Sequence, residues 1–179
     1  MSIPTTFTIE TQNYRLRLPS RADFPFIFSA TRVEGFNDGM LWEPPETMDE
    51  LEAPLLRGLE AWKEGRAYGF AIERKTDQQF LGRISIRKTD EELVWNIGFW
   101  THPDFQSQGV MTEVIGGILT FGFQELSAVR ITADYATWNL ASEKVLHNNG
   151  FSFVRFIEHG FQKHGQWIAE NHVAIDRHS

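Results

Sequence analysis

The segment from Gln106 to Met111, with the sequence Gln-Ser-Gln-Gly-Val-Met, has the residue types of an anion-binding turn. It lies between a run that predicts a strand, Leu93 to Thr101, and a run that predicts a helix, Val110 to Gln124. Such a turn leaves backbone N–H groups unpaired at the helix start, where the helix dipole also favours negative charge. Gly109 permits a positive φ and a close approach to the backbone. The turn could therefore bind a phosphate, or it could be an ordinary strand-to-helix connection.

A second segment with chemical potential follows about one strand later in the chain. Asn139 and Ser142 form an Asn-x-x-Ser pattern, which is followed by Gly150-Phe151. Asn139 is a favourable N-cap for a short helix from Asn139 to Asn149, and Ser142 could satisfy the same helix end. Taken alone, each residue therefore fits a capping role as well as a chemical one.

The elements that must position these residues follow from hydrophobic periodicity and capping patterns. The order predicts an α+β fold with a mostly antiparallel sheet and one strand–helix–strand crossover in the middle. Glycines inside the third helix indicate that it packs closely on the sheet. The predicted strands are Tyr14 to Leu18, Tyr68 to Arg74, Phe80 to Arg87, Leu93 to Thr101, Val129 to Tyr135, Phe151 to Glu158 and Gln166 to Ile175. The predicted helices follow Ser20 and Thr47, and then span Val110 to Gln124 and Asn139 to Asn149.

Composition limits the class of protein. The 179 residues, 41% of them hydrophobic, suit a single domain over 1–179. The net charge of −7 argues against nucleic acid as a partner, because phosphate contacts need clustered cations. The same charge fits a cationic acceptor such as an amine or a basic peptide, although it could serve solubility alone.

The chain contains no cysteine, which excludes disulfides, thiolate metal sites and a cysteine nucleophile. Its six histidines show no metal-binding spacing, so no metal is expected. The stretch from Met1 to Glu10 lacks the pattern of a signal peptide, and Val114 to Phe123 is too short to span a bilayer. The expectation is a cytoplasmic protein without a membrane partner.

Together, the two segments, Gln-x-x-Gly-x-Met after a strand and then Asn-x-x-Ser with Gly-Phe, resemble the Gcn5-related N-acetyltransferase (GNAT) superfamily. The superfamily turn often ends in Gly or Ala where this chain has Met111. Within it, the chain is similar to the RimJ/RimL branch of ribosomal-protein N-terminal acetyltransferases. The resemblance extends from about Thr11 to about Asp176. It is supported by matches to the family's third strand, fourth strand and the loop before its second helix, namely Leu81 to Ile86, Ile97 to Trp100 and Trp42 to Pro45. It implies a GNAT-like mixed, twisted sheet of about seven strands flanked by about four helices.

The resemblance also implies acetyl-CoA as cosubstrate. In the family, the pyrophosphate lies on the turn that matches Gln106 to Met111, and the pantetheine arm pairs with the strand that matches Phe99 to Thr101. The Asn that matches Asn139 contacts this arm. The residues implied to bind the coenzyme are Phe99, Trp100, Thr101, Gln106, Ser107, Gln108, Gly109, Val110, Met111 and Asn139.

The catalytic residues implied by the resemblance are Ser142 and Glu158. The Ser that matches Ser142 is a proposed general acid for the leaving thiolate. The ribosomal-protein enzymes carry a Glu shortly after Gly-Phe, but an ungapped count places Phe161 there. A small loop shift could bring Glu158 or His159 to that position, and Glu43 is a further candidate base.

The resemblance therefore predicts an acetyl-CoA-dependent N-acetyltransferase acting on a primary amine, such as the α-amino group of a protein or peptide N-terminus. A small amine remains open as the acceptor. A non-catalytic acyl-CoA-binding or regulatory module, and an interaction protein with a purely structural turn, are alternatives from other classes. The exposed edge of the last strand also leaves room for a homodimer.

Overall fold

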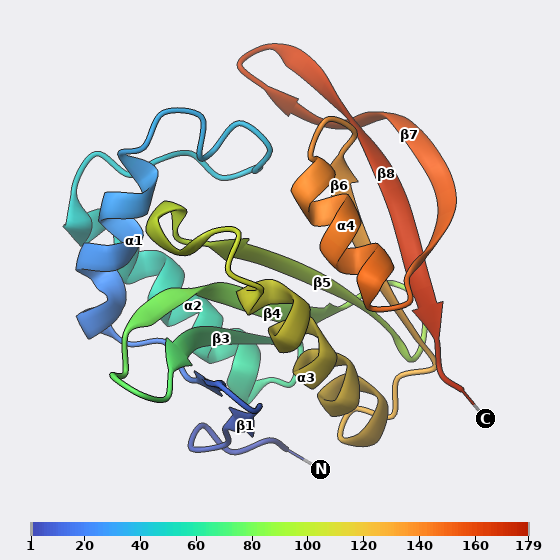
Figure 1. The fold of residues 1–179 in the computed structure, drawn as a ribbon, viewed down its shortest axis with the longest axis horizontal. Helices are drawn as coiled ribbons and strands as arrows, with labels where there is room; N and C mark the ends of the chain where they lie inside the picture. Colours follow the sequence, from blue (N-terminus) through green and yellow to red (C-terminus); the bar gives the residue numbers. More distant parts are fainter. Residues whose placement is uncertain (1, 179) are drawn as a thin grey trace.

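An eight-stranded, strongly twisted sheet forms the centre of the protein (Figure 1). The computed structural model describes residues 2–178. The α+β class and the mostly antiparallel sheet are confirmed. The strands are β1 (Ile9–Glu10), β2 (Tyr14–Arg17), β3 (Ala67–Arg74), β4 (Phe80–Lys88), β5 (Val94–Thr101), β6 (Arg130–Ala136), β7 (Ser152–Lys163) and β8 (Gln166–Asp176).

The strand order is β1-β2-β3-β4-β5-β6-β8-β7, and only β5 and β6 are parallel neighbours. Seven of the strands correspond to the predicted ones. The eighth, β1, pairs Ile9 with Leu16 and is only two residues long, so it carries no periodic signal. The parallel pairing of β5 with β6 covers Val94 to Ile97 and then ends. The sheet therefore divides between these two strands beyond Ile97.

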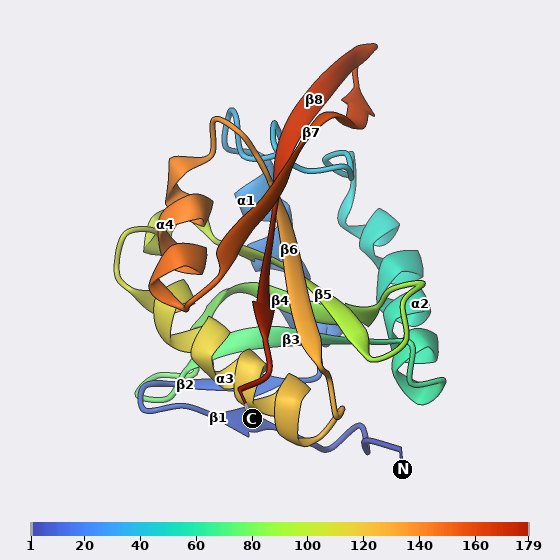
Figure 2. The ribbon, with the colours of Figure 1, turned by 90° about the vertical axis from the view of Figure 1, so that its right-hand side faces the viewer.

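Four α-helices flank the sheet, with α3 and α4 on one face and α2 on the other (Figure 2). We call these the α3 face and the α2 face. Helix α1 packs on the α2 face through Ile27, which is buried against Ala71 and Phe80. The helices are α1 (Phe24–Thr31), α2 (Glu52–Lys63), α3 (Val110–Gln124) and α4 (Leu140–Asn148), and three short 3₁₀ turns are Arg21–Asp23, Met48–Leu51 and Pro103–Phe105.

Close packing of α3 on the sheet depends on two of its glycines. A Cβ at Gly122 would lie 2.6 Å from Cδ1 of Ile131, and one at Gly117 would lie 2.9 Å from Cγ2 of Thr11. The prediction that small residues let this helix approach the sheet is therefore confirmed at both positions. No helix among residues 2–178 is long and apolar enough to cross a bilayer.

The last two strands form a hairpin that projects beyond the rest of the molecule (Figure 2). β7 was predicted to end at Glu158, but it continues to Lys163. The turn that closes the hairpin is His164-Gly165, and both residues have positive φ, at 50° and 77°. The sequence pattern missed this extension because the pairing of β7 is shifted between Ile157 and Phe161, which breaks the two-residue alternation.

Candidate active site

The turn before α3 has the geometry of an anion-binding site. Gly109 adopts φ 76°, and Ser107 adopts φ 63°, so two residues in three lie in the left-handed region. Space around Gly109 is open, because a Cβ there would meet nothing within 4 Å. The side chains from Gln106 to Gly109 are exposed, whereas those of Val110 and Met111 are buried. Val110 and Met111 can therefore offer only backbone N–H groups to a ligand.

His102 connects this turn to α1. Its Nδ1 accepts a hydrogen bond from the backbone N–H of Asp104 at 3.1 Å, and its Nε2 lies 2.9 Å from Oγ of Ser29. Since Nδ1 is an acceptor, a neutral ring carries its proton on Nε2 and donates it to Ser29. Burial lowers the pKa of His102, although Asp104 opposes this effect. The neutral ring therefore holds the segment between β5 and the turn in place through these two hydrogen bonds.

Glu113 anchors the first turn of α3 and directs its carboxylate to Thr11 and Asn13. Its carboxylate accepts hydrogen bonds from Oγ1 of Thr11 at 2.5 Å, the backbone N–H of Asn13 at 2.8 Å and Nδ2 of Asn13 at 2.7 Å. Burial opposes ionisation of Glu113, but these hydrogen bonds prevail and its pKa lies below the ordinary value. The first turn of α3 is thus tied to the β1–β2 connection by an ionised carboxylate.

The divided sheet places Phe99, Trp100 and Thr101 along an open edge of β5. These residues pair with β4 but lie beyond the last residue that pairs with β6. Phe99 packs in the core on the α3 face, whereas Trp100 packs with the cluster on the α2 face. An extended ligand arm can therefore pair with the backbone of this edge as an added strand.

Gly82 on β4 allows β4 to pack closely against β5 behind this open edge. A Cβ at Gly82 would lie only 2.2 Å from the backbone oxygen of Trp100. Glycine is therefore required for β4 to approach β5 at this point. The open edge of β5 is held in place by the strand behind it.

Asn139 and Ser142 meet at the start of α4, as the sequence predicts for a capped helix. Oδ1 of Asn139 accepts a hydrogen bond from the backbone N–H of Ser142 at 3.1 Å. The capping role uses the side-chain oxygen of Asn139, so its amide Nδ2 can still donate to a ligand. Ser142 is partly exposed, and its hydroxyl group is available at the helix start.

Glu158 lies in β7 rather than in a loop. Its side chain is exposed, and β8 separates β7 from β6 in the sheet. Phe161, which occupies the ungapped position of the family's Glu, is partly buried and pairs with Ile168. Glu43 hydrogen-bonds His164 at 3.2 Å, and this bond, together with Lys163, holds the pKa of Glu43 below its ordinary value. An ionised carboxylate with a low pKa is a weak base.

A row of polar side chains on the α2 face was not anticipated from the sequence. Nδ2 of Asn96 donates to Oδ2 of Asp134 at 3.0 Å, and Oδ1 of Asp134 lies 2.5 Å from Nδ1 of His172. Glu170 lies two residues from His172 on β8, and burial, followed by the charge of Asp134, raises its pKa. Only the strand register brings these residues together, so no local sequence pattern could have identified them.

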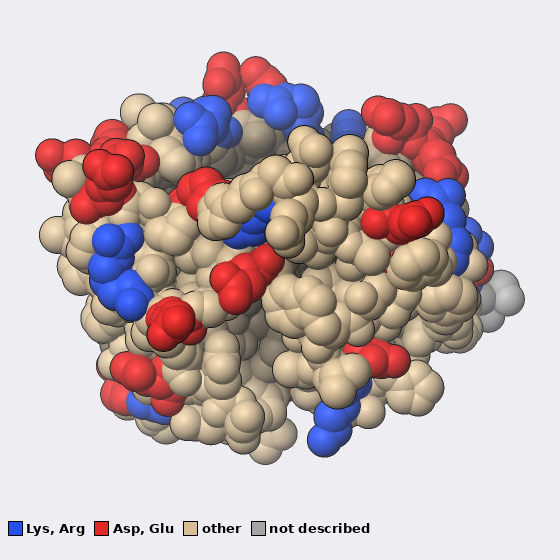
Figure 3. All heavy atoms as spheres, turned by 90° about the horizontal axis from the view of Figure 1, so that it is seen from above, with Lys and Arg blue, Asp and Glu red and all other residues tan. Residues whose placement is uncertain are grey.

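The loop between α1 and α2 is fastened to the β7–β8 hairpin by Lys163, which is 9% exposed. Nζ of Lys163 donates to the backbone oxygens of Met40 at 2.6 Å and Trp42 at 3.3 Å, and lies 3.5 Å from Oε1 of Glu43. Figure 3 views the molecule from above and shows most charged side chains at its margins, with one largely covered cation near the middle beside an acidic group. Lys163 also lines a cavity of about 440 Å³, together with Asp38, Trp138, His164, Gln166 and Ile168.

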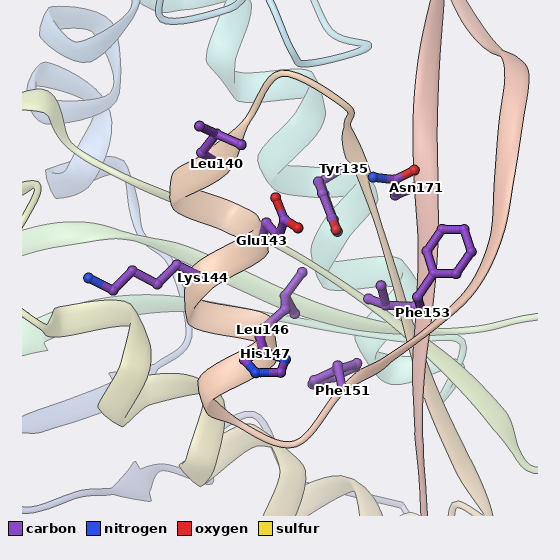
Figure 4. A pocket seen from close by; sticks show the side chains of 10 residues that line it. Tyr135, Leu140, Glu143, Lys144, Leu146, His147, Phe151, Phe153 and Asn171 are labelled. Carbon is purple, nitrogen blue, oxygen red and sulfur yellow. The ribbon is translucent and has the colours of Figure 1, made fainter.

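A second cavity, of about 500 Å³, lies between α4 and strands β6, β7 and β8. In Figure 4 the carboxylate of Glu143 points toward Tyr135, and Asn171 lies on β8 beyond that ring. Lys144 points away from them, toward the opposite side of α4. Among residues 2–178, no group of three or more His, Asp or Glu side chains is arranged to hold a metal ion.

Comparisons with known proteins agree with this geometry. Residues 13–152 match the family model of the acetyltransferase (GNAT) domain. The chain is 27% identical to YnaD, an uncharacterized N-acetyltransferase of Bacillus subtilis, over 63% of this chain and 66% of that protein, just under two thirds of its length. It is 26% identical to YjcK of the same organism, described as a probable N-acetyltransferase, over 96% of this chain and 91% of that protein.

Among solved structures, the fold is similar to that of RimL, a ribosomal L7/L12 α-N-protein acetyltransferase in complex with coenzyme A. The TM-score is 0.85 and the sequence identity 18%, with 95% of this chain and 98% of that chain covered. The family match covers most of the chain and includes the turn before α3 and the start of α4. The chain therefore belongs to the acetyltransferase (GNAT) domain family.

Proposed function

We propose that the chain transfers the acetyl group of acetyl-CoA to the α-amino group of a protein or peptide N-terminus. The observation that carries this proposal is the divided sheet. On the α3 side of the sheet, the turn around Gly109 is open to an anion. A cavity of about 440 Å³, lined by residues of the α1–α2 loop and of the β7–β8 hairpin, would admit the acceptor. RimL, which acts on a ribosomal protein α-amino group, has a similar fold.

The coenzyme is assigned to the α3 side. Its pyrophosphate would accept hydrogen bonds from the backbone around Ser107, Gln108 and Gly109, and its pantetheine arm would pair with β5 from Phe99 to Thr101. Nδ2 of Asn139 would donate to the arm, and the hydroxyl of Ser142 would protonate the departing thiolate. Glu158 remains a predicted base, and its side chain is exposed on β7.

An α-amino group suits this site better than a lysine side chain. Its pKa of about 7.7–8.0 leaves a substantial neutral fraction near pH 7, whereas lysine near 10.4 is almost wholly protonated. Positioning of the two substrates can then supply much of the rate enhancement.

The test is a calorimetric titration of the purified chain with acetyl-CoA and with desulfo-CoA, followed by CoA release with peptides and small amines. We expect micromolar binding that survives loss of the sulfur, and faster release with peptides than with small amines. Preference for a small amine would overturn the assigned acceptor. Binding without release for any amine would instead indicate a non-catalytic module.

A further inference from the structure

The polar row on the α2 face contains a carboxylate–imidazole pair that no assignment above uses. Oδ1 of Asp134 lies 2.5 Å from Nδ1 of His172, and the other carboxylate oxygen accepts from Asn96 at 3.0 Å. The two side chains are 30% and 19% exposed, so solvent and a ligand can both reach them. Asp134 therefore holds Nδ1 of His172, and the other ring nitrogen, Nε2, takes no part in this contact.

The pair lies where β5 and β6 separate. Ala133 is the last residue of β6 that pairs with β5, and Asp134 is the next residue along the strand. The turn before α3 follows the C-terminal end of β5, so a coenzyme with its phosphates there would direct its acyl end back toward Gly98. This step rests on the proposed function. The acetyl carbonyl would then lie near the point where β5 and β6 separate. An acceptor would reach Asp134 and His172 from the α2 face.

We propose that Asp134 and His172 form the proton-accepting site for the acceptor, and that its substrate is a primary ammonium group approaching from the α2 face. Asp134 accepts a hydrogen bond from Nδ1–H of His172 and thereby keeps the lone pair on Nε2. Nε2 takes one proton from the ammonium group, and the neutral nitrogen attacks the acetyl carbonyl carbon. The carbon–sulfur bond breaks, the amide nitrogen loses its second proton and the thiolate gains one through Ser142. One proton, carried by His172, leaves to solvent.

Other charged groups on this face surround the pair. Glu170 of β8 adds negative charge that favours an incoming cation, while Arg155 of β7 lies opposite His172 in the strand register. Arg87 of β4 donates to Oδ1 of Asn96 at 3.2 Å and so orients the amide that supports Asp134. One further carboxylate, that of Glu170, therefore lies near the pair, and the two arginines lie on the outer strand and behind Asn96.

The experiment measures CoA release from acetyl-CoA with a peptide that carries a free N-terminal serine, from about pH 6 to about pH 9.5. The variants are His172→Gln and Asp134→Asn. His147→Gln, an exposed histidine of α4, is the control for the first. Asp176→Asn is the control for the second, because Asp176 pairs with Arg130 on the same two strands. Glu158→Gln tests the base predicted from the sequence.

We expect kcat/KM for the peptide to fall about 100-fold in His172→Gln near pH 7, since general base catalysis contributes about 10²–10⁴-fold. The acidic limb of its pH profile should move to the pKa of the peptide amine, about 7.7–8.0, and most activity should return at high pH. Affinity for acetyl-CoA and the activities of both controls should be unchanged.

The proposal would be overturned if His172→Gln kept kcat/KM within twofold of the unmodified chain and kept the same pH profile. It would also be overturned if only Glu158→Gln lost activity. A failed acceptor assignment is distinguishable from this, because the unmodified chain would then bind acetyl-CoA without acetylating peptides. In that case slow hydrolysis of acetyl-CoA, with water as acceptor, is compared between the same variants. Hydrolysis that is unaffected by both Asp134→Asn and His172→Gln would also overturn it.

Discussion

The two sides of the divided sheet are built in different ways. On the α3 side, the turn to which we assign the coenzyme would offer backbone N–H groups, and its conformation is set by a few consecutive residues around Gly109. On the α2 side, Asp134, His172 and Lys163 make their contacts through their side chains and come from three separate strands. A backbone site is thus encoded locally, whereas a side-chain site depends on strand register. The two sides should therefore respond separately to substitution.

The largest effect should come from Gly109→Asp, which places a carboxylate against the proposed pyrophosphate. Like charges in contact cost several kcal/mol, so affinity for acetyl-CoA should fall at least about 100-fold in calorimetric titrations. Gly109→Asn is the matched control, because asparagine tolerates positive φ and has the same shape without the charge. Equal affinities of these two variants would show that negative charge is not excluded from the turn.

Ser142→Ala should separate chemistry from binding on the α3 side. Loss of a general acid lowers turnover by about 100-fold or more, whereas the N-cap formed by Asn139 is retained because it uses the backbone N–H of residue 142. We expect a reduced kcat in steady-state assays with an unchanged dissociation constant for acetyl-CoA. Wild-type turnover in this variant would remove the acid role of Ser142.

Lys163→Met should disturb only the α2 side. It removes two charge-assisted hydrogen bonds to the loop but keeps an apolar stem, at a cost of roughly 1.5–3 kcal/mol for each bond in a favourable case. The loop should then be released, and KM for a peptide acceptor should rise about tenfold, equivalent to about 1.4 kcal/mol. Affinity for acetyl-CoA should stay constant, and a parallel loss of it would contradict the independence of the two sides.

Glu113→Gln should have the smallest effect, confined to stability. The folded pKa of Glu113 is depressed, so its stabilisation is present above the unfolded pKa of about 4.3 and is lost as pH falls through the folded pKa. We expect the variant to be roughly 1 kcal/mol less stable at neutral pH, as for the loss of hydrogen bonds to a partly exposed charge. Urea unfolding should show this difference shrinking below about pH 4.3; a constant difference would exclude an ionisation effect.

The sequence predicted the α3 side well because its signals are local. Val110 to Gln124 has the bounds of α3, and the positive φ of Gly109 is the conformation for which glycine is preferred. The close packing at Gly117 and Gly122 also follows from residue size within one helix. Each of these predictions needed only neighbouring residues.

The α2 side could not be predicted in the same way. Asp134 and His172 are 38 residues apart, and Lys163 reaches a backbone oxygen 123 residues earlier in the chain. Their contacts depend on the order β6-β8-β7 and on the irregular pairing after Ile157, neither of which is visible in periodicity. The histidines showed no metal-binding spacing in the sequence, and the pairing of His172 with a carboxylate emerges only from the fold.

The fastening of the loop by Lys163 has a mechanical consequence. The hydrogen bond joins two segments that are 123 residues apart in the chain, and both segments contribute residues to the cavity of about 440 Å³. A displacement of the hairpin would therefore carry the loop with it, so the two walls of this cavity would move as one unit.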